Sequence, residues 1–108
     1  MTDKELLELA AKAAGYGLYF SQKYHRNIND AYLNDRLWNP LTDDGDALRL
    51  AVKLNVDVVF DFDRVMAVYG NGYSKEEYFY ELPEPTDRYA ATRRAIVRAA
   101  AEIGKGMK

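Results

Sequence analysis

One short stretch constrains the fold more than any other part of this sequence. Residues 38–50 read WNPLTDDGDALRL, which joins an aromatic side chain, a proline, a polar cap and the start of an apolar helix. Because proline disfavours helical geometry in the residue before it, the chain should turn at Asn39. Trp38 should pack against the helix that follows, as a hydrophobic staple, although an exposed tryptophan can also serve in recognition.

The polar part of this stretch predicts where the helix begins and ends. Thr42 or Asp43 can cap a helix that runs to Leu54, with Asn55 as a left-handed exit. The polar residues that follow the cap fall on one narrow stripe of this helix: Asp46, Arg49 and Lys53. Most of the helix surface should therefore be covered by other elements.

The acidic residues of 43–46 also suggest a metal site, since hard cations bind clustered oxygen atoms. Their spacing does not fit a calcium-binding loop, because Leu54 stands where that loop needs a glutamate. Capping of the helix and interaction with its dipole account for these carboxylates. We therefore expect no metal site.

The N-terminal third predicts a helix, a strand and a loop. Residues 2–5 form a capping-box pattern before a helix that should end at Ala14, with Gly15 as its left-handed stop. Residues 17–24 have the composition of a strand, whereas residues 25–37 are polar and indicate an irregular loop. Some side chains of this loop should turn inward: Ile28, Tyr32 and Leu37.

The second half of the chain predicts an antiparallel meander. Residues 56–62 alternate between apolar and polar side chains, and residues 77–82 alternate again. Residues 64–69, between them, are apolar on both faces, which is typical of a central strand covered on two sides.

A last helix is predicted over residues 88–103, capped by Thr86 or Asp87 and stopped by Gly104. Three helices and about four strands favour an α/β/α sandwich of the α+β type, built on one antiparallel sheet. A two-layer α+β fold is the alternative. The length of 108 residues predicts a single domain, residues 1–108.

Composition narrows the possible functions. The chain has no cysteine, which excludes disulfides and cysteine-based metal sites. Its formal net charge of −2 argues against a protein that mainly coats nucleic acid or an anionic membrane. It shows neither a leader pattern nor an apolar stretch long enough to span a bilayer, so we expect a cytoplasmic protein.

Nine tyrosines are a clear excess for a chain of this length. Several polar aromatic and amide residues in or beside predicted loops can form a rigid contact patch: Tyr24, Tyr32, Tyr69, Asn71 and Tyr73. The alternative is that these tyrosines cover the edges of the sheet. They are the first candidates for contact with a partner protein.

The last helix carries the candidates for an anionic partner: Arg88, Arg93, Arg94 and Arg98. Guanidinium groups can grip phosphates through paired hydrogen bonds, which makes a nucleic-acid or nucleotide binder an alternative function. The alternative without a binding role is that these arginines form a charged helix face exposed to water.

His25 is the only histidine and hence the candidate base of a small hydrolase, a further alternative. The sequence shows no nucleophile or orienting carboxylate placed to work with it, and no glycine-rich phosphate loop. We therefore expect a solvated loop histidine, no catalytic residue, no cofactor and no enzymatic activity.

The motifs together resemble those of small phage-encoded proteins of the ABA-sandwich and NinX-like kind. The resemblance rests on Trp38–Pro40, Asp46–Ala47 and Arg93–Arg98, and covers roughly the C-terminal two-thirds of the chain. It implies a phage accessory protein with helices on both sides of a sheet. With the tyrosine-rich loops, it favours a non-enzymatic protein that binds a bacterial host or defence protein in the cytoplasm of the infected bacterium.

Overall fold

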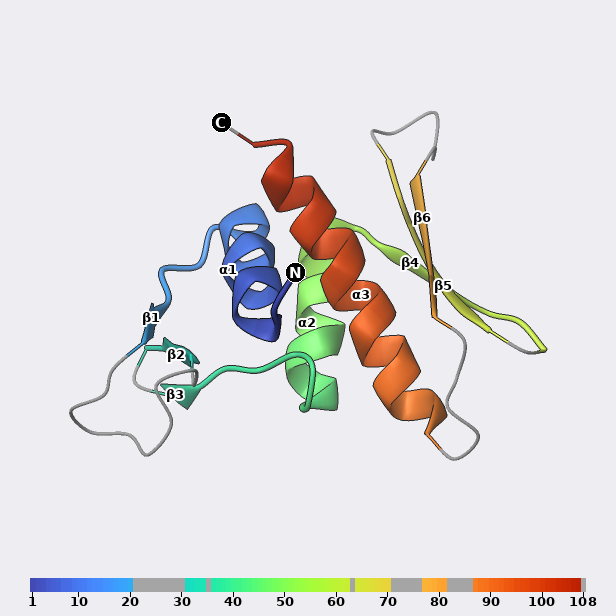
Figure 1. Cartoon of the computed structure of the whole chain (residues 1–108), viewed down its shortest axis with the longest axis horizontal. Helices are drawn as coiled ribbons and strands as arrows, with labels where there is room; N and C mark the ends of the chain where they lie inside the picture. The colour runs from blue at the N-terminus through green and yellow to red at the C-terminus, as the bar shows by residue number, and fades with distance from the viewer. Residues whose placement is uncertain (21–30, 35, 63, 71–76, 82–86, 108) are drawn as a thin grey trace.

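The computed structural model describes residues 1–20, 31–34, 36–62, 64–70, 77–81 and 87–107 (Figure 1). The helices of this part are α1 (Asp3–Ala14), α2 (Asp44–Leu54) and α3 (Arg88–Lys105). Its strands are β1 (Tyr19–Phe20), β2 (Ala31–Leu33), β3 (Arg36–Leu37), β4 (Asp57–Phe60), β5 (Val65–Tyr69) and β6 (Glu77–Glu81). The described part of the chain is thus a small α+β fold with three helices, as the sequence predicts.

Both ends of α1 and α2, and the start of α3, follow the predicted local signals. The hydroxyl of Thr2 accepts the Glu5 N–H at 3.1 Å, and the Thr2 N–H donates to the Glu5 carboxylate, which completes the capping box. Side-chain oxygens of Asp43 and Asp87 cap α2 and α3. The left-handed exits are also confirmed, since φ is +75° at Gly15 and +60° at Asn55.

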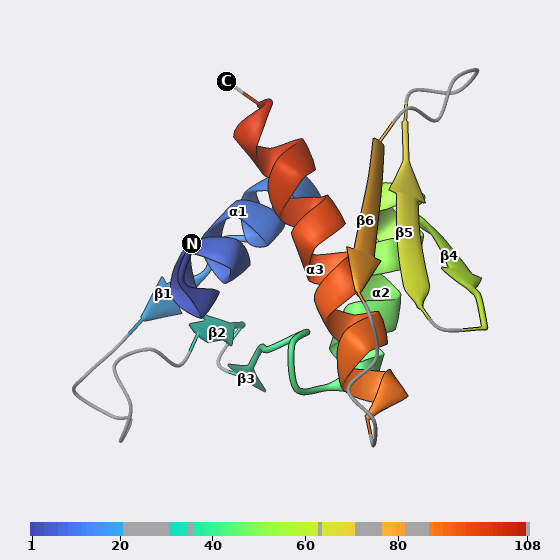
Figure 2. The same cartoon turned by 45° about the vertical axis from the view of Figure 1, so that its right-hand side comes forward.

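The strands of the described residues form two antiparallel sheets rather than one. Their orders are β1-β2-β3 and β4-β5-β6. The helices lie between the two sheets, and α3 packs on one face of β5 and β6 (Figures 1 and 2). Among the described residues, no helix covers the opposite face. The prediction of an α/β/α sandwich on a single sheet of about four strands therefore requires correction.

The reason for this difference lies in β5. Val65 and Ala67 are fully buried, on the side where α3 packs. Val68, on the other face, is also buried, although no described helix lies over it. A central strand has a neighbour on each side, and in-sheet neighbours shield its side chains. Apolar residues on both faces of β5 therefore did not require a second helical layer.

The segment predicted to be an irregular loop contains β2 and β3, while the predicted strand 17–24 is described over residues 17–20 and is a strand there at β1. Leu37, which we expected to turn inward, is 56% exposed. Trp38 is buried instead, because successive side chains of an extended chain point to opposite sides. Ile28 lies outside the described residues.

Trp38 is a core residue, as the staple interpretation predicts. Its ring meets that of Tyr16 edge to face, with centroids 5.8 Å apart. It belongs to the same buried cluster as Leu50 of α2 and Ala31 of β2. The aromatic residue before the Asn-Pro turn therefore ties the first sheet to the helices, and does not serve as an exposed recognition residue.

The third helix continues past its predicted stop. Gly104 lies inside α3 and is buried, because the backbone of α1 at Leu9 passes so close that a Cβ atom would clash with it. Small side chains accompany this crossing on both helices: Ala10, Ala11 and Ala14 in α1, and Ala99, Ala100 and Ala101 in α3. Gly104 permits close helix packing and does not end the helix.

Candidate functional site

The exposed face of α2 is only partly the polar stripe that the sequence predicts, because Arg49 and Lys53 are exposed as expected but two apolar side chains accompany them. Leu48 is 64% exposed and Val52 is 72% exposed, whereas Asp46 is buried. The Asp46 carboxylate accepts the Asn39 N–H at 3.0 Å and a guanidinium hydrogen bond from Arg49 at 2.9 Å. Each helical residue turns by about 100°, so an inward Asp46 places Leu48 and Val52 on the far side of the helix.

Beside this face lies an open groove of about 580 Å³ between α2, β4 and α3. Its walls are mainly apolar, with a few polar groups: Asp44, Ala47, Leu48, Val58, Phe60, Arg88, Tyr89, Thr92, Arg93 and Ile96. The groove exists because α3 packs on β5 and β6, while β4 runs away from α2 after the turn at Asn55 (Figure 1). We call it the α2–β4 groove.

The rim of the α2–β4 groove exposes large apolar side chains to water. Phe60 is 61% exposed and Tyr89 is 73% exposed, in addition to Leu48, and the exposed Val52 lies about one helical turn from Leu48 on the same face of α2. Since a whole aromatic side chain offers about 150–250 Å², the two rings leave roughly 200–300 Å² in water. The largest apolar patch on a typical monomer is about 300–600 Å² and is often functional. With the two aliphatic side chains, this rim reaches that range.

Arg93 lines one side of the groove, and its guanidinium group binds other residues of the same chain. Its Nη1 atom lies 2.6 Å from a carboxylate oxygen of Asp44, and its Nε donates to the Leu41 carbonyl oxygen at 2.9 Å. Only 16% of its side chain is exposed. Arg93 therefore fastens α3 to the start of α2, contrary to the expectation that it points away from the core.

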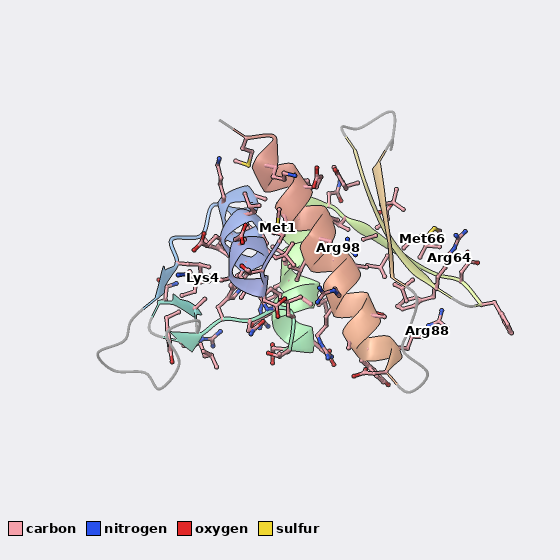
Figure 3. All side chains as sticks on the ribbon, in the orientation of Figure 1. Met1, Lys4, Arg64, Met66, Arg88 and Arg98 are labelled. Atoms are coloured by element: carbon pink, nitrogen blue, oxygen red, sulfur yellow. The ribbon has the colours of Figure 1, made fainter. Side chains whose placement is uncertain are left out.

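Arg88 has a similar role at the other end. Its guanidinium donates hydrogen bonds to the backbone carbonyl oxygens of Asp61, Phe62 and Arg64, and lies 5.6 Å from the centre of the Phe60 ring. These contacts hold the β4–β5 turn against the first turn of α3. Figure 3 shows Arg88 and Arg64 together near this end of the sheet.

The remaining arginines lie elsewhere on α3. Arg94 is exposed and lies 3.8 Å from the Asp3 carboxylate of α1. Arg98 is also exposed, farther along the helix than Arg88 (Figure 3). The structure therefore divides the four candidate arginines between internal contacts, at Arg88 and Arg93, and the water-exposed surface.

The tyrosine patch is only partly within the described residues. Tyr24, Asn71 and Tyr73 lie outside them, and so does His25. Tyr32 in β2 and Tyr69 in β5 are both half-buried, and they belong to different sheets with the helices between. The structure does not bring these two tyrosines together.

The acidic residues 43–46 have roles within the chain. Asp43 caps α2 through the Asp46 N–H at 2.8 Å, Asp44 pairs with Arg93, and Asp46 fixes the Asn-Pro turn at Asn39. Sequence reasoning missed the buried position of Asp46. The signal in the sequence was a carboxylate seven residues after the turn amide of Asn39, which that carboxylate accepts as a hydrogen-bond donor.

No protein-family model, curated protein or solved structure matches this chain. The resemblance to small phage-encoded proteins therefore stays a prediction. Among the residues that the structure describes, no helix is both long enough and apolar enough to cross a membrane.

Proposed function

We propose that this chain is a non-enzymatic binding protein that docks a partner protein in the α2–β4 groove. The observation that carries the proposal is the exposure of Leu48, Phe60 and Tyr89 around one concave surface, with the exposed Val52 next to Leu48 on the same helix face. Burying such side chains against a partner is favourable by roughly 25 cal/mol for each Å² of apolar surface. Aromatic side chains of this kind are also typical anchors of protein interfaces.

The arginines support a protein partner over a nucleic acid. Binding to a polyanion depends on cationic groups that are available to phosphates. Arg88 already donates to three backbone carbonyl oxygens, and Arg93 is held by Asp44 and Leu41. The formal net charge of −2 adds no general attraction for phosphates. The apolar groove is the stronger basis for recognition.

The proposed setting comes from the sequence motifs. Their resemblance to small phage-encoded proteins favours a phage accessory protein, whose partner is a bacterial host protein or a defence protein that it counteracts. The groove provides the contact surface in this proposal, in place of the tyrosine-rich loops.

The test compares matched variants of the full chain. Tagged protein, with the tag at either end in turn, captures partners from a bacterial lysate, and the captured protein is purified for affinity measurement. Leu48→Glu should weaken binding at least about tenfold, because it places a charge in the apolar wall. Leu37→Glu is the control, since Leu37 is similarly exposed but lies on β3.

Both variants change an exposed leucine to glutamate, so a general effect of the substitution should appear in both. Specific binding that survives Leu48→Glu would contradict the groove as the contact surface. Failure to capture any specific partner with either tag position would contradict the proposed function itself.

A further inference from the structure

The α2–β4 groove lies along an open sheet edge. β4 is at the end of the strand order β4-β5-β6, and within the described residues it pairs only with β5. An edge strand offers backbone N–H and C=O groups that another extended chain can use. The apolar walls of the groove do not indicate the conformation of its ligand. The edge strand does, because it favours an extended chain.

The open edge and the exposed face of α2 belong to the same surface. Val58 and Phe60 of β4 line the groove, and so do Ala47 and Leu48 of α2. Figure 2 shows β4 as the outer strand of its sheet, with α2 behind the sheet. A further strand beside β4 would place alternate side chains over the groove, where they would meet the apolar walls.

Charge on the other face of β4 argues against a second copy of this chain paired in the register centred on Val59. Asp57, Val59 and Asp61 alternate with the groove-lining residues, and both carboxylates are at exposed residues. Arg64 lies 3.4 Å from Asp61, with both side chains about half exposed. Antiparallel pairing of two β4 strands centred on Val59 would set Asp57 opposite Asp61 twice, and like charges placed opposite each other are destabilising.

We propose that an extended segment of the partner protein adds to the β4 edge as a fourth strand of this sheet. Its apolar side chains, at every second residue, enter the α2–β4 groove. On its other face, lysine or arginine residues four positions apart meet Asp57 and Asp61. Main-chain hydrogen bonds supply affinity in this mode of recognition, and the alternate side chains supply specificity. The inference rests on the proposed function and specifies its partner.

The test selects short random peptides displayed in a library against the immobilised full chain. Enriched peptides should alternate apolar and polar residues, with basic residues four positions apart. Synthetic versions should bind Leu48→Glu at least about tenfold more weakly than the parent chain, and Leu37→Glu as well as the parent. On binding, amide hydrogen exchange within 57–60 should slow.

Backbone N-methylation of the best peptide separates a strand from a helix. In an added strand, only every second N–H faces β4, so methylation should abolish binding at alternate positions. Apolar anchors spaced three and four residues apart would show a docked helix and overturn the inference. Unchanged amide hydrogen exchange in β4 would also overturn the inference. The same holds if no selected peptide loses affinity for Leu48→Glu.

Two further results separate the possible failures. If the chain alone forms a dimer that Leu48→Glu dissociates, as measured by sedimentation equilibrium, a second copy occupies the groove and the inference is wrong. If a captured partner depends on Leu48 but binds through a helix, the proposed function stands and only the added strand is refuted.

Discussion

Arg93 and Asp44 join α3 to the start of α2 across 49 residues of sequence, with Nη1 and Oδ1 only 2.6 Å apart. The Leu41 carbonyl oxygen is a second acceptor for the same guanidinium. We expect Arg93→Ala to lower the free energy of unfolding by about 1–2 kcal/mol, because a largely buried charged donor is lost. Because Asp44 is largely exposed, water screens its ion pair with Arg93, and this pair contributes only a small part of the loss. Urea denaturation followed by Trp38 fluorescence measures it.

Arg94→Ala is the matched control on the same helix. Its guanidinium is about half exposed and lies 3.8 Å from Asp3, so the loss should stay within about 0.5 kcal/mol. Equal losses for the two variants would contradict the structural role assigned to Arg93.

Gly104→Ala should separate α1 from α3, because the new Cβ would clash with the backbone of Leu9. Alanine favours a helix by about 1 kcal/mol over glycine, but the clash should reverse this and destabilise the fold by about 1–3 kcal/mol. Gly106→Ala provides the comparison, since its nearest atom would be 3.6 Å away and its φ is −77°. Thermal unfolding should show a lower midpoint for the first variant alone. A neutral Gly104→Ala would disprove the close crossing.

Trp38 should report on the core. As the only tryptophan, and a buried one, it should emit at short wavelength in the native protein and shift to longer wavelength on unfolding. Trp38→Ala should cost about 3–5 kcal/mol, enough to unfold a marginal domain, while Trp38→Phe should cost less. Circular dichroism measures both variants. Native emission typical of an exposed indole would show that the ring is not packed against Tyr16.

The capping box should lower the pKa of Glu5 in the folded chain. The backbone N–H of Thr2, and secondly its hydroxyl, donate to the Glu5 carboxylate and hold its pKa below the ordinary value of 4.5. A depressed folded pKa means that this stabilisation is present above the unfolded pKa and is lost as pH falls through the folded one. Side-chain NMR titration should therefore give a lower midpoint in the folded chain than in urea.

Thr2→Ala keeps the backbone donor and removes the hydroxyl, so it should bring the Glu5 midpoint partly back toward the value in urea. A midpoint that is the same in the folded and unfolded chains would refute the capping box in solution.

Several features of the fold could be predicted because their causes are local. The cap at Thr2, the choice between Thr42 and Asp43 as the cap of α2, and the left-handed exits at Gly15 and Asn55 depend on a few neighbouring residues and their backbone geometry. The buried position of Trp38 follows from its place before the Asn-Pro turn. These signals fixed where elements begin and end, and they did not specify which elements pack together.

The candidate groove could not be predicted, because it depends on how elements are oriented. Asp46 was assigned to a polar stripe with Arg49 and Lys53, but its carboxylate is buried against the Asn39 N–H, and Leu48 is exposed on the opposite side of the helix. Arg93 was assigned to the surface, yet it fastens two helices together.

The sequence by itself determined the presence of the three helices, the cap of the first, the antiparallel meander and the aromatic staple, and it narrowed each of the other two N-caps to two residues. Each of these features depends on hydrogen bonds and side-chain periodicity within a short segment. Only the tertiary structure decided that the strands divide into two sheets, that Gly104 marks a helix crossing, and that apolar side chains of α2 and β4 face one groove. These features depend on the packing of residues distant in sequence, and the same apolar side chain can serve either an internal contact or an interface.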